Sequence, residues 1–165
     1  MDSTQAKAIA DFLIADFERE IPTTARVLEA VPAGKHDYSP DQKSKSAAGL
    51  VRHITMVDEW FFHCIADGTF ARPVDDSDKC GLADGAAAAK QYQAKVPQAL
   101  ARLRSLPGDE LAKVIDFFGV MQLPRVNMIS LAAKHSVHHR GQLSAYLRAM
   151  GAKVPGIYGP SGDTK

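Results

Sequence analysis

Three of the six histidines in this chain lie within five positions of the segment KHSVHHRGQ, residues 134–142. An α-helix advances about 100° per residue, so His135 and His139 would lie one turn apart and about 40° from each other around the axis. His138 would lie at the edge of that arc, and Arg140 would point away from it. The same arc also carries the apolar residues Met128, Leu131, Ala132, Leu143 and Tyr146. This spacing predicts that His135 and His139 face the protein interior.

A third histidine occupies an equivalent position on an earlier helical segment. With His53 as the reference, the apolar residues Leu50, Val57, Trp60 and Phe61 all fall within about 80° of it. For a lone histidine on an apolar face, the usual alternative is a core residue that is hydrogen-bonded to a carbonyl or carboxylate oxygen. The pair at residues 135 and 139 is harder to explain in that way, because two unpartnered imidazoles cost several kcal/mol to bury.

A metal ion would resolve the cost of burying these imidazoles. Histidines at positions i and i+4 can reach one ion, as in the HExxH helix of zinc proteases. The glutamate of that motif is missing here, so the protease mechanism is not supported. Adding His53 to His135 and His139 favours a site with three histidines, which leaves one coordination position for water or substrate.

Other residues of metal-binding type are weaker candidates. Cys64 shares the stripe of His53 but lies about 16 Å further along the helix, so we expect a core thiol. We expect His63 at the surface or the edge of the stripe. Asp16 and Glu20 could supply a further ligand, although a solvated helix face is the expected place for both.

The chemistry of an open three-histidine site is activation of a nucleophile, because a bound cation promotes deprotonation of water or of a thiol near neutral pH. Imidazole ligands suit zinc, nickel, copper and iron, and we expect zinc first and nickel second. Gln142 lies on the same stripe and is a candidate to orient a ligand. Tyr158 in the C-terminal tail is a second candidate, with a hydrophobic plug as the alternative. No general base stands out beside the histidines.

Four helical segments would position these residues. We expect an all-α four-helix bundle with long crossover loops, because two connections exceed ten residues and no sheet is convincing. Ser3 or Thr4 should cap the first helix, and Pro22 should kink or divide it. Residues 114–124 are ambiguous between a strand and an extended connector. The expected helices span residues 3–30, 46–66, 82–106 and 124–150.

Composition excludes several classes of protein. The 165 residues are 45% hydrophobic and 24% charged, with a formal net charge of +1. This is typical of a globular chain, here expected to form a single domain over residues 1–165. The sequence shows no basic stripe for nucleic acid, no apolar run for a membrane span, and no apolar region of a secretory signal at the N-terminus. Cys64 and Cys80 form no CxxC pair, so a cytoplasmic location is expected.

The chain resembles the DinB-like (DinB/YfiT-type) family of bacterial metalloproteins. YSPDQKSKSAAGLVRHI is similar to the loop and second-helix histidine of that family. HSVHHRGQLSAYLRAMG resembles its HxxxHRGQ helix, and KVPGIYGPSGD its C-terminal segment. The resemblance implies a four-helix bundle that holds one divalent metal ion per chain through His53, His135 and His139, and a frequent homodimer.

The same resemblance suggests what the site does. Members with an assigned activity include metal-dependent thiol transferases and a thiol-dependent isomerase, and many members have none. We therefore expect a metal-dependent hydrolase or thiol S-transferase that acts on a small molecule. The alternative is a non-catalytic metal-binding protein of a stress or damage response.

Overall fold

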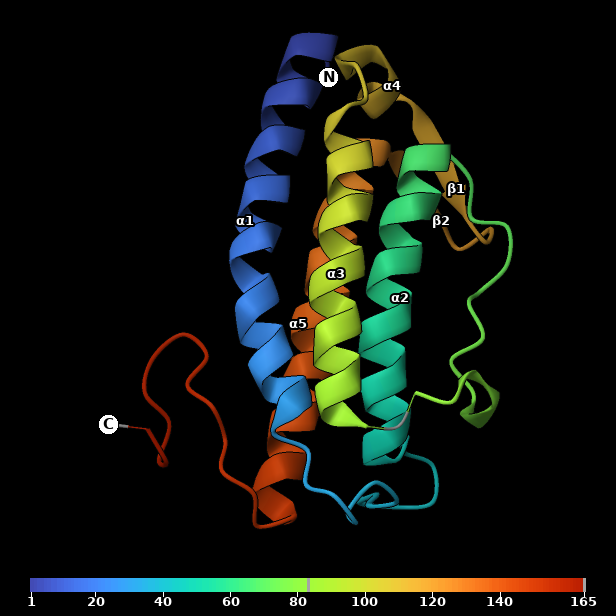
Figure 1. The fold of residues 1–165 in the computed structure, drawn as a ribbon. Coiled ribbons are helices and arrows are strands. Elements are labelled where there is room, and N and C mark those ends of the chain that lie inside the picture. The colour runs from blue at the N-terminus through green and yellow to red at the C-terminus, as the bar shows by residue number, and fades with distance from the viewer. Residues whose placement is uncertain (83, 165) are drawn as a thin grey trace.

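Four long helices form the body of the molecule in this computed structural model, which describes residues 1–82 and 84–164 (Figure 1). The helices are α1 (Ser3–Glu29), α2 (Ala47–Asp67), α3 (Gly85–Arg104) and α5 (Arg125–Ala149). Helix α1 packs against α3 and α5, and α2 packs against the same two helices. The expected all-α four-helix bundle is confirmed.

The connections between helices explain why the topology is not a simple up-and-down one. In Figure 1, α2 and α3 run in the same direction, antiparallel to α1 and α5. Residues 68–82 must therefore return along the length of the bundle, and they include the short 3₁₀ helix η1 (Asp78–Cys80). This crossover loop passes beside α2, where it contributes to the site described below.

Local sequence signals explain the helix ends. Asp2, rather than the expected Ser3 or Thr4, caps α1 by accepting a hydrogen bond from the Gln5 amide, and the Gln5 side chain bonds back to Asp2 in a capping box. Ser46 caps α2, and Gly68 ends it with a φ of 80°. Pro22 lies inside α1 without dividing it into two helices, so of the two effects expected of this proline, division is excluded.

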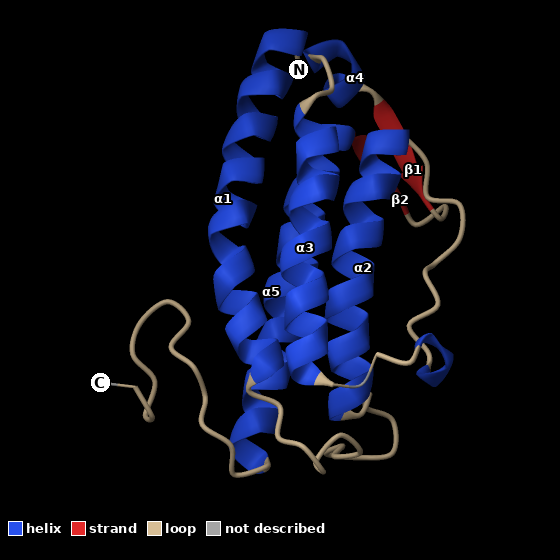
Figure 2. Cartoon of the chain, viewed as in Figure 1, coloured by secondary structure: helices blue, strands red, loops and turns tan. Residues whose placement is uncertain are grey.

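The ambiguous segment before α5 is a small β-hairpin (Figure 2). It follows the short helix α4 (Gly108–Ala112) and consists of β1 (Val114–Phe117) and the antiparallel β2 (Met121–Pro124). Phe118 and Gly119 at its tip have φ values of 52° and 71°. Positive φ at both central residues matches a type I′ turn, in which a phenylalanine is unusual.

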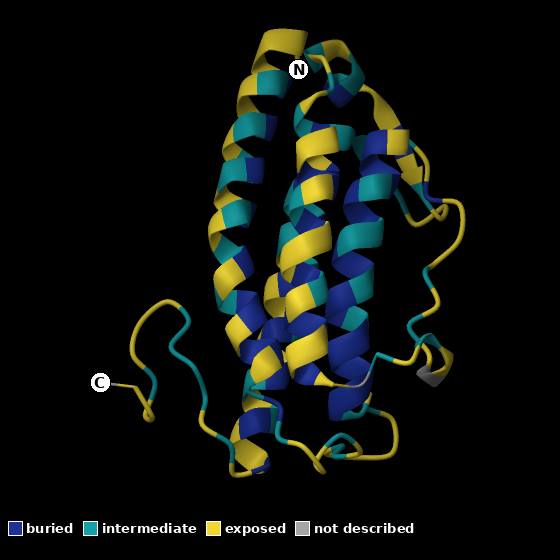
Figure 3. Ribbon diagram, in the orientation of Figure 1, coloured by how far each residue is buried: buried dark blue, intermediate teal, exposed yellow. Residues whose placement is uncertain are grey.

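The core lies between the helices, and its burial pattern differs from helix to helix. Helices α1 and α3 each show an exposed outer face, whereas α2 is buried on most sides (Figure 3). Phe17 of α1 and Phe62 of α2 meet edge to face at the centre, with ring centroids 4.7 Å apart. Among the helices of the described residues, none combines the length and the hydrophobicity of a membrane-spanning segment.

Candidate metal centre

Three histidines from two antiparallel helices converge at one point in the bundle. The Nε2 atom of His53 on α2 lies 3.0 Å from Nε2 of His135 and 3.2 Å from Nε2 of His139, both on α5. All three residues are half-buried. The structure thus brings together the three histidines that helical spacing places in the interior.

Two of the imidazole rings are held by contacts at Nδ1, the ring nitrogen that does not face the other histidines. Nδ1 of His53 lies 2.6 Å from a carboxylate oxygen of Asp76 in the crossover loop. Nδ1 of His139 lies 2.7 Å from the side-chain oxygen of Gln142, one turn further along α5. Both oxygens are acceptors, so each Nδ1 carries the proton, and in a neutral ring the lone pair is left on Nε2. Gln142 therefore has the orienting contact expected of it.

The third imidazole ring, that of His135, is the first member of a series of buried polar side chains that contact one another. Nδ1 of His135 lies 3.4 Å from one oxygen of Asp58, whose side chain is 1% exposed. The other Asp58 oxygen accepts a hydrogen bond of 2.8 Å from the hydroxyl of Tyr92 on α3, and Ser136 lies 3.5 Å from that hydroxyl. Burial and the Asp58 charge raise the pKa of Tyr92 well above its usual value, so the hydroxyl stays protonated and donates a hydrogen bond to the carboxylate.

This arrangement fits a divalent cation. Tetrahedral coordination with metal–nitrogen distances of about 2.0–2.1 Å places two ligand nitrogens about 3.4 Å apart, close to the distances from His53 to the other two rings. Without a cation, three lone pairs would face one another in a half-buried space. Carboxylate or amide oxygens behind ligating imidazoles are a common feature of metal sites.

The pKa values of two of the histidines favour the neutral ligand form. Burial lowers the pKa of His139 to about 4, and the hydrogen bond to Gln142 opposes this only in part. Burial also lowers the pKa of His53, against the opposing effect of Asp76. Both rings are therefore neutral at pH 7 and need lose no proton before they bind a metal.

The residues outside the cluster fall largely where the sequence predicted. The side chain of His138 is exposed, and His63 is half-buried, 3.8 Å from Glu59. Cys64 is buried, and desolvation raises the pKa of its thiol to about 11. It is the core thiol expected, and at neutral pH it is protonated and unreactive.

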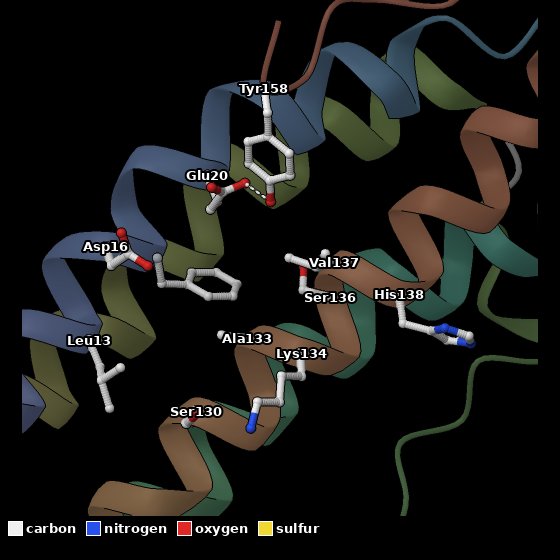
Figure 4. Close-up of a pocket in the computed structure, with 11 residues that line it drawn as sticks. Leu13, Asp16, Glu20, Ser130, Ala133, Lys134, Ser136, Val137, His138 and Tyr158 are labelled. Carbon is white, nitrogen blue, oxygen red and sulfur yellow. Dashed lines mark hydrogen bonds between the residues drawn. The ribbon is translucent and has the colours of Figure 1, made fainter.

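Two expectations about the other face of α5, those for Glu20 and Tyr158, were wrong. Arg140 points away from the histidines as expected, but it is 1% exposed and donates hydrogen bonds to Glu20 at 2.5 Å and to Thr24 at 3.1 Å. Glu20 is thus the partner of a buried guanidinium instead of lying on a solvated face. Figure 4 shows Tyr158 bonded to Glu20 beside a hollow between α1 and α5. The Tyr158 hydroxyl also accepts a hydrogen bond from Arg140, and none of the three clustered histidines lines this hollow. These contacts leave neither Glu20 nor Tyr158 beside the three imidazoles.

Two carboxylates at the site were missed from the sequence. Asp58 lies about 140° from His53 around α2, outside the apolar stripe, but α2 is buried on that side as well. Asp76 lies in an irregular loop, where no periodicity indicates direction. The sequence showed no general base beside the histidines, whereas the structure places the carboxylate of Asp76 at Nδ1 of His53 and that of Asp58 at Nδ1 of His135.

Fold and site together define a four-helix bundle with a three-histidine cluster between two antiparallel helices. Comparison with known proteins assigns the family, because the sequence model of the protein family described as "DinB family" matches residues 4–164 of this chain. The chain belongs to the DinB family.

Bacillus subtilis strain 168 supplies two relatives. The uncharacterized protein YjoA is 30% identical over 142 residues, which cover 84% of this chain and 89% of YjoA. The uncharacterized protein YrdA is 41% identical, but over only 51 residues, 31% of this chain and 30% of YrdA.

Solved structures of DinB-like proteins superpose on the four-helix bundle of this chain. The crystal structure of the DinB-like protein YjoA from B. subtilis superposes with a TM-score of 0.68 at 25% identity, over 90% of this chain and 99% of that one. A DinB-like protein from Bacillus cereus ATCC 10987 superposes with a TM-score of 0.73 over 88% of this chain and 95% of that one. Its 19% identity makes it evidence for the fold alone.

Proposed function

We propose that this protein binds one divalent metal ion through His53, His135 and His139 and uses it as a hydrolase or thiol S-transferase on a small molecule. The observation that supports the proposal is the convergence of three Nε2 atoms. Zinc is the first expectation and nickel the second, because imidazole ligands suit both and availability in the cell decides between them.

The residues behind the rings have defined roles in this proposal. Asp76 and Asp58 hold two of the imidazoles in the orientation that aims Nε2 at the ion, and their negative charges offset part of its positive charge. Gln142 orients the third ring without adding charge. When bound, the ion supplies a Lewis acid that activates a water or thiol nucleophile near neutral pH.

An open coordination position is what separates this proposal from a structural metal site. Structural zinc sites are closed by four protein ligands and are commonly rich in cysteine. Among the described residues, the three histidines are the group that meets the geometry for an ion, and Cys64 is absent from it. The alternative, a non-catalytic metal-binding protein of a stress response, would have only water in that position.

Metal stoichiometry and turnover test the two halves of the proposal. Elemental analysis of protein without a histidine tag should give one ion per chain, because there is one convergent ligand set. Two ions per chain, or none after reconstitution, would contradict the metal site. A screen of low-molecular-weight thiols with electrophiles, and of small esters and amides, should then show turnover that follows metal content. Full metal loading without turnover across the panel would favour the non-catalytic alternative.

A homodimer is a further part of the proposal, with the α1–α5 side of the bundle as its interface. Phe12 on α1 is 66% exposed and Val137 on α5 is 39% exposed. The hollow between these helices has a volume of about 370 Å³ and carries acidic Asp16 on one helix and Lys134 on the other. A second copy related by a twofold axis would match apolar to apolar and acid to base. Phe12→Asp should therefore halve the mass measured by light scattering, and an unchanged mass would refute this interface.

A further inference from the structure

A hollow of about 270 Å³ opens directly beside one of the histidines. His53 and Asp76 lie at its polar side, and Trp60, Val74 and Phe118 form its apolar wall. These residues come from α2, from the crossover loop and from the tip of the β-hairpin, three segments far apart in the sequence. A molecule in the hollow would therefore contact the candidate metal centre and an apolar surface at the same time.

The aromatic side of the hollow is fixed in position. The Trp60 indole N–H donates a 2.8 Å hydrogen bond to the main-chain oxygen of Arg72, which holds the ring. Phe118 stacks on it with an interplanar angle of 11° and ring centroids 6.3 Å apart. Two rings held in this way form a preorganised surface for a flat apolar group.

Phe118 occupies this place at a cost. Its φ of 52° is a left-handed conformation that a bulky residue rarely adopts, and its side chain is 42% exposed. Its ring also lies 5.2 Å from the ring of Phe117 and 6.1 Å from that of Phe70, so it belongs to an aromatic cluster beside the hollow. Backbone strain such as that of Phe118 is found preferentially at ligand-binding sites.

A positive charge lies at the polar end of the hollow. Lys45 contributes to its lining and also lines a neighbouring hollow of about 280 Å³ together with Lys43 and His139. Its ammonium lies 3.0 Å from Asp76, but the side chain is 44% exposed, so this ion pair is weak. An ammonium has three donors, which leaves Lys45 able to bind an anion in the hollow.

We propose that this hollow binds a small carboxylate that carries an aromatic ring, with the ring against Trp60 and Phe118 and the carboxylate at Lys45. The inference rests on the proposed function, since it names the substrate class of the same centre. The ligand would place its polar end next to His53, within reach of a metal ion held there. Its ring would exclude water from one side of the centre.

Trp60 makes the binding directly measurable, because it is the single tryptophan of the chain. Phenylacetate is the probe, with phenylacetamide as its uncharged analogue and acetate as the analogue without a ring. Titration of the zinc-loaded protein should quench Trp60 fluorescence in a saturable way with phenylacetate, about tenfold more weakly with phenylacetamide and hardly with acetate. Calorimetry gives the same dissociation constants independently of the fluorophore.

Two variants separate the ring contact from the charge contact. Phe118→Asn removes the ring while suiting the left-handed backbone, so the protein should remain folded and bind both aromatic probes about fivefold more weakly. Lys45→Met should weaken phenylacetate about five- to tenfold and leave phenylacetamide unchanged. Lys95→Met, at an exposed position on α3 away from the hollow, is the matched control for the charge and should bind both probes like the wild type.

The outcomes distinguish this inference from the proposed function. Protein that holds one ion per chain yet shows no saturable binding of phenylacetate, or binds acetate equally well, overturns the inference and leaves the metal site standing. Lys45→Met and Phe118→Asn that both bind like the wild type overturn it as well. Protein that binds no metal but binds phenylacetate in a way that depends on Lys45 and Phe118 supports the inference and contradicts the proposed function.

Discussion

Removal of a single buried hydroxyl tests the polar chain behind His135. In Tyr92→Phe the ring stays, but Asp58 loses the 2.8 Å hydrogen bond that satisfies one of its oxygens. Tyr92 is 0% exposed and the Asp58 side chain 1%, so water cannot replace the lost donor. A hydrogen bond to a charged group contributes about 1.5–3 kcal/mol, and the free energy of unfolding should fall by that amount.

The measurement is a thermal melt of metal-free protein, in which a bound ion cannot mask the loss. For a chain of this length, each kcal/mol lowers the melting temperature by about 2–4 °C, so Tyr92→Phe should melt about 3–12 °C below the wild type. Tyr146→Phe is the matched control, because that hydroxyl donates a 3.2 Å hydrogen bond to the main-chain oxygen of Lys45 at an exposed position. It should cost less than about 0.5 kcal/mol. Equal melting temperatures for the two variants would show that the Tyr92 hydroxyl does not stabilise Asp58, and would refute the reasoning.

The remaining predictions concern the histidines and the metal. Asp76→Asn should weaken metal binding about 10- to 100-fold in a chelator competition, because it loosens His53; unchanged affinity would contradict an orienting role. His139→Ala should abolish tight binding while His138→Ala keeps it, and equal losses would place the metal elsewhere. Chelation should lower the melting temperature by several degrees yet leave the circular dichroism helical, since the core does not depend on the ion; loss of helicity at 20 °C would make the ion structural. Metal-free protein should lose stability as the pH falls from about 6.5 towards 4, because the unfolded chain then binds protons that His139 and His53 in the native state do not. Melts across this range should show a weaker dependence for His139→Gln, and an equal slope would contradict the assignment.

Helical periodicity was sufficient to find the three histidines but not the groups that support them. His53, His135 and His139 each lie on the same side of their helix as apolar residues. The angles of residues around each helix axis are enough to show this. Asp58 lies on a different side of its helix and is nevertheless buried, because α2 has helices on two sides and is covered over much of its circumference. Asp76 depends on the path of a loop that no periodic pattern describes.

The same limit explains why the burial of Arg140 was not predicted. Its angle from the histidines was right, but a direction away from one neighbouring helix does not tell whether another helix lies there. Helix α5 packs against α2 on the histidine side and against α1 elsewhere. Arg140 points towards α1, where Glu20 and Thr24 receive its donors. Only the order of the helices around the bundle could have placed these residues together.

The positions of the three histidines along the chain have a consequence for folding. Two of them lie on successive turns of α5, whereas His53 is separated from His135 by 82 residues. An ion held by the pair alone involves one helix, but engagement of His53 closes a ring through half of the chain. A covalent cross-link over a loop of that length would raise the free energy of the unfolded chain by about 4.5 kcal/mol, because it reduces the conformational entropy of that chain. The ion would thus act as a reversible cross-link between the two halves of the polypeptide, and this cross-link would form only after α2 and α5 have packed together.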